Sequence, residues 1–229
     1  MNANLGFPMP FNLNQLAKTL SYFEAIPLLS NFQRMFHPTP PPQQPQIVLS
    51  STGEKILFDF RTQIDLTQTW GAVDDVVMGG VSESGIIKSI EGALFTGNVS
   101  TDQSGGFVSV RTRNFPEPLD LSMYQGLELR LKGDGNRYKF FVRSSLGWDT
   151  LAYAYAFDTI AAEWITVRVP FLDMVAVQRA KTVDNAPPVD IRNLRSLQFM
   201  LSKFEYNGQL NPRFTAGRFS LSIESIRAY

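Results

Sequence analysis

Apolar and polar residues alternate in short runs along the chain from residue 47 onward. Leu127, Leu129 and Leu131, for example, are separated by single charged residues. Alternation with a period of two is typical of a strand that buries one face. Similar runs lie at Ile56 to Phe60, Ile86 to Ile90, Ala93 to Thr96, Phe107 to Arg111, Tyr138 to Val142, Ala152 to Phe157, Trp164 to Val169, Leu197 to Leu201 and Phe219 to Ile226. The pattern predicts about ten strands.

The connections between these runs indicate the fold class. Gly133-Asp134-Gly135-Asn136 separates two of the runs, and such turn residues predict a β-hairpin there. No long helical period lies between the strands, so parallel βαβ units are disfavoured. Because 229 residues suffice for one substantial core, we expect a single all-β domain. Its predicted architecture is an antiparallel β-sandwich or jelly roll.

Residues 1–36 follow a different pattern. Four apolar residues recur there at spacings of three and four, namely Leu13, Leu16, Leu20 and Phe23. This spacing predicts a short amphipathic helical extension at the N-terminus, interrupted at Pro27. The apolar stripe can pack back onto the β-domain, dock to a partner or lie on a membrane surface, and the sequence leaves all three open.

Residues 37–46 are rich in proline, with five prolines in ten positions. Such a composition favours extended backbone and removes hydrogen-bond donors, so this stretch is predicted to be a semi-rigid linker. The chain therefore divides into a helical extension (1–36), a proline-rich linker (37–46) and a β-domain (47–229).

The overall composition limits the partners and the location. Basic and acidic residues balance at 21 each, so no net charge attracts nucleic acid, and we expect no nucleic-acid partner. No stretch approaches the roughly 20 apolar residues of a membrane-spanning helix. The first residues lack the features of a secretory signal or a transit peptide. We expect a cytoplasmic protein that is not secreted.

Residues that commonly carry catalysis are scarce. The chain has no cysteine, and its single histidine, His37, lies in the proline-rich linker. Cysteine nucleophiles and a Ser-His-Asp triad are thereby excluded. Several acidic residues are scattered along the β-domain, and nothing selects a catalytic pair among Glu91, Asp102, Asp149 and Asp158. We therefore predict no enzyme activity, no catalytic residues, no metal site and no cofactor.

One segment combines a large aromatic residue, two adjacent acids, a methionine and a glycine pair, and it runs from Trp70 to Ser82. Its glycines can adopt positive φ and allow a close backbone approach. In one interpretation Trp70 and Met78 plug the end of the sandwich, and in the other the segment recognises a partner. The candidate partner-binding residues are Trp70, Asp74, Asp75, Met78, Gly79, Gly80 and Ser82, together with Leu13, Leu16, Leu20 and Phe23.

The segment Trp70 to Ser82 resembles the signature of the complex I intermediate-associated protein 30 family, in which a tryptophan precedes an acidic residue and Val-Met-Gly-Gly-x-Ser. Other stretches resemble the family in the same order, namely Phe95 to Val99, Gly105 to Thr112, Lys132 to Lys139, Trp164 with Val169 to Phe171, and Phe219 to Ile226. Together they cover about residues 56–229. Several motifs in the right order are more specific than any one alone.

This resemblance implies a galactose-binding-like jelly roll without established catalytic residues. It also implies a role in assembling membrane complexes, because mitochondrial members help to build respiratory complex I and relatives in photosynthetic organisms support photosystem biogenesis. The missing transit peptide favours a bacterial, cyanobacterial source over a mitochondrial one. A peripheral position at an inner or thylakoid membrane follows from such a role.

The sequence thus predicts a non-catalytic assembly factor or chaperone. Its expected partners are subunits or intermediates of a membrane electron-transfer complex, either a complex I or NDH-type complex or a photosystem. The alternative function is that of a carbohydrate-binding module, because jelly rolls commonly hold sugars by stacking them on exposed aromatic residues. The aromatic residues available for this are Trp148, Tyr153 and Tyr155.

Overall fold

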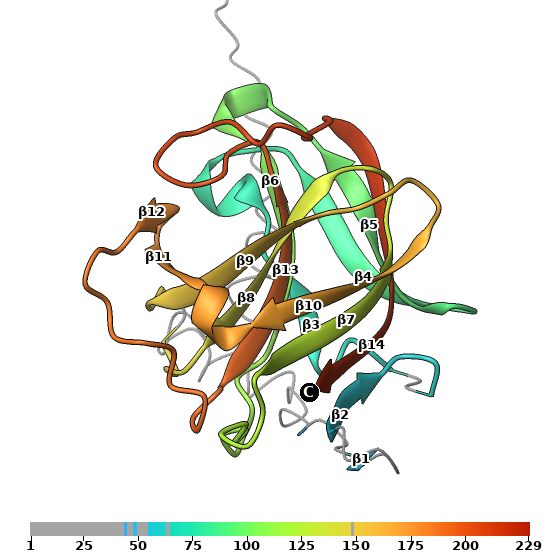
Figure 1. Cartoon of the computed structure of the whole chain (residues 1–229). Coiled ribbons are helices and arrows are strands. Elements are labelled where there is room, and N and C mark those ends of the chain that lie inside the picture. The colour runs from blue at the N-terminus through green and yellow to red at the C-terminus, as the bar shows by residue number, and fades with distance from the viewer. Residues whose placement is uncertain (1–43, 45–47, 50–54, 63–64, 148) are drawn as a thin grey trace, which may run out of the picture.

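The computed structural model describes residues 44, 48–49, 55–62, 65–147 and 149–229. They form two seven-stranded sheets that pack face to face (Figure 1). Sheet A contains β1 (Val48–Leu49), β2 (Lys55–Asp59), β4 (Glu83–Ser89), β5 (Gly92–Val99), β7 (Gly126–Lys132), β10 (Trp164–Pro170) and β14 (Gly217–Ala228). Sheet B contains β3 (Trp70–Ala72), β6 (Phe107–Thr112), β8 (Arg137–Arg143), β9 (Ala152–Asp158), β11 (Val175–Gln178), β12 (Lys181–Thr182) and β13 (Ser196–Ser202). The predicted antiparallel β-sandwich is confirmed.

Strand β14 organises sheet A. Its first part, Gly217 to Ile223, pairs with β5, and its last part, Ser225 to Ala228, pairs with β2. Along its other edge it pairs with β7, which in turn pairs with β10. One strand therefore joins three others of the same sheet.

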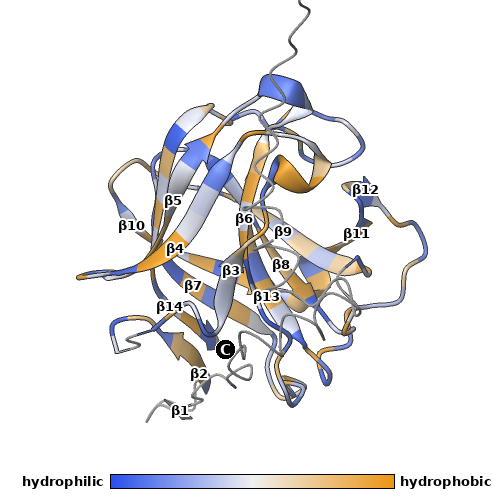
Figure 2. Ribbon diagram, turned by 180° about the vertical axis from the view of Figure 1, so that it is seen from behind, coloured by the Kyte–Doolittle hydropathy of each residue, from blue (hydrophilic) through white to orange (hydrophobic). Residues whose placement is uncertain are grey.

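The core lies between the sheets and is built from the apolar side of each alternating run. Leu129 and Ile223 contribute from sheet A, and Phe140 and Phe199 contribute from sheet B. In β9 the tyrosine and phenylalanine side chains face this core, whereas the buried alanines belong to a separate cluster. Figure 2 shows the resulting alternation of hydrophobic and hydrophilic residues along the strands. The period of two thus marks the buried face of each strand.

The hairpin predicted around Gly133 to Asn136 is wrong. Strand β7 pairs with β10 and β14 in sheet A, whereas β8 pairs with β9 and β13 in sheet B. The turn between them therefore crosses from one sheet to the other. Asp134 fixes the crossing, because its carboxylate accepts hydrogen bonds from the Tyr138 hydroxyl at 3.1 Å and the Ser220 amide at 2.9 Å. Alternation shows which face of a strand is buried but not which strand lies beside it.

Most of the N-terminal predictions lie outside the described residues. These are the helical extension 1–36, with Leu13, Leu16, Leu20 and Phe23, and the linker 37–46 apart from Gln44. The Gln44 side chain exchanges two hydrogen bonds with the main chain of Glu117, at 3.0 and 3.2 Å. The end of the linker is thereby fixed beside the loop that follows β6. No helix among the described residues has the length and apolar character needed to span a bilayer.

Candidate functional site

The segment singled out in the sequence begins in the core. Trp70 lies in β3, and its ring packs against Phe58, Phe60 and Phe199 with centroid distances of 5.5, 5.9 and 6.0 Å. Met78 ends the short 3-10 helix η1 (Asp75–Met78) and is 67% exposed. In the interpretation in which both residues plug the end of the sandwich, Trp70 fits because it is buried in the core, whereas the exposed Met78 does not.

Asp75 is completely buried, and both oxygens of its carboxyl group accept hydrogen bonds within the chain. Its carboxylate accepts bonds from the Ser82 amide at 3.0 Å and the Ser82 hydroxyl at 2.6 Å. It also accepts bonds from the amides of Gly106 at 2.7 Å and Phe107 at 3.2 Å. These donors lie directly before β4 and at the start of β6. Asp75 therefore joins the ends of two strands that belong to different sheets.

Asp74, also buried, makes a second connection between the same two strands. Its carboxylate accepts hydrogen bonds from the Ser84 amide at 2.7 Å and the Ser84 hydroxyl at 2.6 Å in β4. It accepts a third bond from the Ser109 amide in β6, at 3.1 Å. We call this arrangement the aspartate clamp, which consists of Asp74, Asp75, Ser82, Ser84, Gly106, Phe107 and Ser109.

Glycine residues leave space for the Asp75 carboxylate in the clamp. Gly79 ends η1 with a φ of 91°, a left-handed conformation that favours glycine. A Cβ atom at Gly80 or Gly105 would overlap the carboxylate of Asp75. The two glycine pairs in the sequence, 79–80 and 105–106, therefore belong to one arrangement. Sequence reasoning noticed the first pair but did not connect it with the second, although both occur in the stretches that resemble the family.

The clamp changes what the candidate partner-binding residues can offer to another protein. Five of the seven in this segment are buried inside the chain, namely Trp70, Asp74, Asp75, Gly80 and Ser82. Met78 is exposed and Gly79 is partly exposed. Recognition of a partner by this segment stays a prediction, and Met78 is the side chain that is accessible for it.

The environment of Asp74 changes its acidity. Burial raises the pKa of Asp74 from 3.8 to about 7, although the hydrogen bonds from Ser84 and Ser109 oppose the rise. The negative charge of Asp75 adds to the rise. In the folded protein Asp74 therefore keeps its proton at pH values where the unfolded chain has lost it.

The stability of the domain should consequently fall as the pH rises from about 4 to 7. The folded state binds more protons than the unfolded state in this window, so Asp74 contributes a negative slope of at most about 1.4 kcal/mol per pH unit. Urea midpoints of the unaltered protein and of Asp74→Asn, measured at several pH values, separate this contribution from other titrating groups. Equal slopes in the two proteins would contradict the assignment.

An exposed loop, residues 203–211, lies beside the clamp. The Lys203 amide donates to the Gly106 carbonyl at 2.8 Å, which places the loop next to the clamp. Phe204 and Leu210 on this loop are exposed, as is Met78 on η1. Phe204 and Leu210 face each other across an isolated β-bridge, and η1 begins with the clamp residue Asp75. We call these three apolar side chains, which lie on two segments attached to the clamp, the apolar end of the sandwich.

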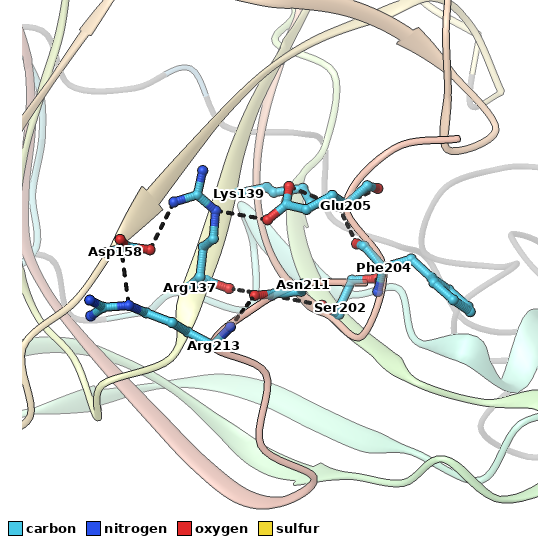
Figure 3. Close-up of polar contacts among 8 residues, drawn as sticks. All are labelled: Arg137, Lys139, Asp158, Ser202, Phe204, Glu205, Asn211 and Arg213. Carbon is cyan, nitrogen blue, oxygen red and sulfur yellow. Dashed lines mark hydrogen bonds and ion pairs between the residues drawn. The ribbon is translucent and has the colours of Figure 1, made fainter. Parts of the chain in front are cut away.

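A polar network anchors this loop to sheet B (Figure 3). Glu205 forms an ion pair with Arg137 at 2.8 Å. Lys139 donates to the carbonyls of Phe204 and Glu205, at 2.5 and 2.8 Å. Burial lowers the pKa of Lys139 to about 8, partly offset by the charge of Glu205. The same network includes Asp158, Ser202, Asn211 and Arg213. The loop is therefore held in a defined position, and its exposed residues sit on an ordered backbone.

The two described aromatic residues among those considered for sugar binding, Tyr153 and Tyr155, do not form an exposed platform. Tyr153 is buried, and its hydroxyl donates to the Pro187 carbonyl at 2.7 Å. Tyr155 is partly buried against the core, and Trp148 lies outside the described residues. An apolar cavity of about 460 Å³ adjoins Tyr153 between the 3-10 helix η3 (Phe171–Asp173) and residues 183–191.

The scattered acids stay apart in the fold. Three of them form separate ion pairs, which are Glu91 with Lys132, Asp149 with Arg179, and Asp158 with Arg137. The fourth, Asp102, is exposed in the 3-10 helix η2 (Asp102–Ser104). Within the described ranges, no group of three or more His, Cys, Asp or Glu side chains is arranged to hold a metal ion. The geometry therefore brings together the clamp and the apolar end, but no cluster of acids.

Residues 58–223 match the sequence profile of the family described as complex I intermediate-associated protein 30. The chain belongs to this family. The matched region runs from β2 to β14 and contains the whole aspartate clamp. The clamp therefore lies inside the part of the chain that matches the family profile.

Single relatives agree with this assignment. This chain is 31% identical over 177 residues to an uncharacterized protein of Schizosaccharomyces pombe. The match covers 70% of this chain and 78% of that protein. The structure of this chain resembles that of a family 11 carbohydrate-binding module from Clostridium thermocellum, which was solved in complex with a β-1,3-1,4-mixed-linked tetrasaccharide. The TM-score is 0.52 and the sequence identity is 20%, over 78% of this chain and 96% of the module. An agarase is similar with a TM-score of 0.50 and 9% identity, over 76% of this chain and 26% of that chain. At these identities the structures show the fold alone, and the galactose-binding-like jelly roll is confirmed.

Proposed function

We propose that this member of the complex I intermediate-associated protein 30 family is a non-catalytic assembly factor for a membrane electron-transfer complex. The observation that carries the proposal is the family match over residues 58–223, which covers nearly all of the described β-domain. The client is a complex I or NDH-type complex or a photosystem. The protein binds subunits or assembly intermediates and covers their exposed interfaces until the next subunit arrives, so no covalent bond is made or broken.

The apolar end supports a protein client. Met78, Phe204 and Leu210 are exposed, and two of the three lie on a loop that ion pairs hold in place. Apolar side chains on an ordered backbone lose little conformational entropy when they are covered by a partner. Subunits of membrane complexes expose apolar interfaces before assembly, and these fit such a surface. The proposed place of action is the cytoplasmic side of an inner or thylakoid membrane, where the client holds the protein peripherally.

Affinity purification from native membranes tests this proposal. The tagged full chain should recover subunits of one electron-transfer complex. A variant with Met78→Ser, Phe204→Ser and Leu210→Ser should recover about tenfold less, because it loses the apolar contact surface. The matched control is Ile90→Ser, since Ile90 is 99% exposed at the turn between β4 and β5, away from the apolar end. Recovery of soluble background proteins alone would count against the assembly role.

Carbohydrate binding is the second candidate. It is motivated by the similarity of the fold to a sugar-bound module, but the burial of Tyr153 removes one of its stacking residues. A glycan array separates the two functions. We expect no binding above background, and a specific signal on one class of glycan would favour the second candidate.

A further inference from the structure

Strand β10 lies at an edge of sheet A, and one of its two sides is open. Among the described strands it pairs with β7 alone, along its whole length from Trp164 to Pro170. Figure 1 shows it beside β7 at the front of the molecule. It has seven residues, a usual length for a strand. An edge strand of this length presents a row of backbone N–H and C=O groups to its surroundings.

The pairing with β7 shows which backbone groups face the open side. Phe171, directly after β10, donates its amide to the Gln125 carbonyl at 3.0 Å. The Gly126 carbonyl instead accepts from the Tyr229 amide at 3.2 Å, so Gly126 is directed away from its partner Pro170. Bonded and non-bonded positions alternate along an antiparallel pair. The odd-numbered residues of β10 therefore bond to β7, and the even-numbered residues direct their N–H and C=O groups to the open side.

The sequence of β10 agrees with this assignment. Pro170 has no N–H, and it occupies an even position, where an amide would make no bond to β7. Thr166 and Arg168 supply the amides in the middle of the open side. Both residues are exposed, and neither amide donates to another described segment. An extended backbone can therefore add to this side through hydrogen bonds.

The side chains that flank the open side on the outer surface of sheet A are basic. The Arg168 side chain is 67% exposed and forms an ion pair with Glu128 at 3.3 Å. Arg130 reaches over from β7, where its guanidinium donates to the Thr166 hydroxyl at 3.3 Å and lies 5.5 Å from the centre of the Trp164 ring. Arg130 forms no ion pair with the described residues. A carboxylate placed beside the open side would complement this charge.

The inward side chains of β10 are apolar. Ile165 and Val167 pack against the core but are only partly buried. Side chains of neighbouring strands share the two faces of a sheet. The outward residues of an added strand would therefore lie next to Arg130 and Arg168, and its inward residues next to Ile165 and Val167. Acidic residues complement the first pair and apolar residues complement the second.

A second copy of this chain would not complement the charges. If two β10 strands paired antiparallel about Thr166, Arg168 of each copy would lie opposite Trp164 of the other. That ring already has Arg130 at 5.5 Å and Lys132 at 5.3 Å from its centre. Three cations would then gather around one ring, and like-charge repulsion would oppose self-association. An acidic segment of a different protein avoids this repulsion.

We infer that the open side of β10 binds an extended segment of a partner protein in which acidic and apolar residues alternate. The segment joins sheet A as a further strand. Backbone hydrogen bonds hold it, and Arg130 and Arg168 select its acidic residues. This inference goes beyond the proposed assembly role, because it assigns a contact surface on sheet A that is separate from the apolar end. A peptide tests it without any client, so its failure leaves the assembly role untouched.

A synthetic peptide with a proline variant tests the hydrogen bonds. The probe is a fluorescein-labelled octapeptide of alternating glutamate and valine, and fluorescence anisotropy measures its binding to the full chain. Thr166→Pro removes the central amide of the open side without removing a bond to β7, so it should weaken binding about tenfold or more. Thr166→Val is the matched control, since it also loses the hydroxyl that contacts Arg130 but keeps the amide. Its Kd should stay within about twofold.

Charge variants test the selection of acidic residues. Arg130→Gln combined with Arg168→Gln should weaken binding of the same peptide about tenfold. The control is Arg179→Gln on sheet B, whose side chain is 78% exposed. A peptide with lysine in place of glutamate should bind the unaltered chain about tenfold more weakly or worse. Each variant must retain cooperative thermal unfolding, and the arginine variants keep the test decisive if Thr166→Pro does not fold.

Three results would overturn the inference. The first is that the glutamate peptide does not bind, or binds no better than the lysine peptide. The second is equal binding by folded Thr166→Pro and Thr166→Val, because the open amide would then play no part. The third comes from sedimentation velocity of the full chain, namely a dimer that Thr166→Pro dissociates, since a second copy would then occupy the edge.

Discussion

Replacement of Asp75 with alanine should lower the free energy of unfolding by about 3–5 kcal/mol. The buried carboxylate accepts four hydrogen bonds, from Ser82, Gly106 and Phe107. In Asp75→Ala these donors remain buried without their acceptor, and each unpaired group costs about 1–3 kcal/mol, of which water entering the vacated space recovers part. Urea denaturation followed by intrinsic fluorescence measures the loss.

A matched aspartate close by provides the control. Asp102 is exposed in η2, and its side chain makes no hydrogen bond with the described residues. Asp102→Ala should therefore change the free energy of unfolding by less than about 0.5 kcal/mol. The contrary result is that Asp75→Ala lowers the free energy of unfolding no more than Asp102→Ala does, while client recovery is lost. In that case Asp75 is a contact residue for a partner, and the clamp does not stabilise the fold.

Trp70→Ala should cost about 3–5 kcal/mol of stability, the range observed for large aromatic side chains removed from cores. Its ring lies against Phe58, Phe60 and Phe199, so truncation leaves a cavity between the two sheets. The same denaturation experiment measures the effect. The loss should be visible without any partner present, because the contacts lie entirely within the chain.

Trp70→Phe separates packing from polar contributions. The indole N–H of Trp70 is buried and has no hydrogen-bond partner among the described residues. Its removal therefore costs no hydrogen bond, and phenylalanine fills part of the space, so the loss should be well below that of Trp70→Ala. An unchanged unfolding midpoint in Trp70→Ala, combined with failure to recover a client, would instead support the interpretation of Trp70 as a partner-binding residue.

The strands could be predicted from the sequence because alternation depends only on which residues face the core. Each of the ten predicted runs overlaps a strand of the structure. The strands that were not predicted, β1, β3, β11 and β12, contain two to four residues each. Runs this short show no periodicity. The pairing of β7 and β8 was predicted wrongly for another reason, since turn chemistry does not show whether a connection stays within one sheet.

The aspartate clamp was beyond prediction because adjacent acids usually lie in water. Burial of Asp74 and Asp75 is possible only because amides and hydroxyls from positions 82–84 and 106–109 arrive from two other strands. Those contacts are made across separations that no local pattern reports. The sequence does contain two glycine pairs, 79–80 and 105–106. They indicate where the backbone lies close to another group, but not which side chain that group belongs to.

The position of β14 sets the order of events during synthesis. Residues 217–228 are made after every other described strand, yet they pair with β2, β5 and β7. Sheet A therefore cannot be completed before these residues have left the ribosome. Until then β2 and β5 lack β14, the strand with which both of them pair. The β-sandwich can therefore be completed only once these residues are available, and its high proportion of distant contacts favours slow folding. Before β14 is in place the chain presents open strand edges, which can pair with other chains.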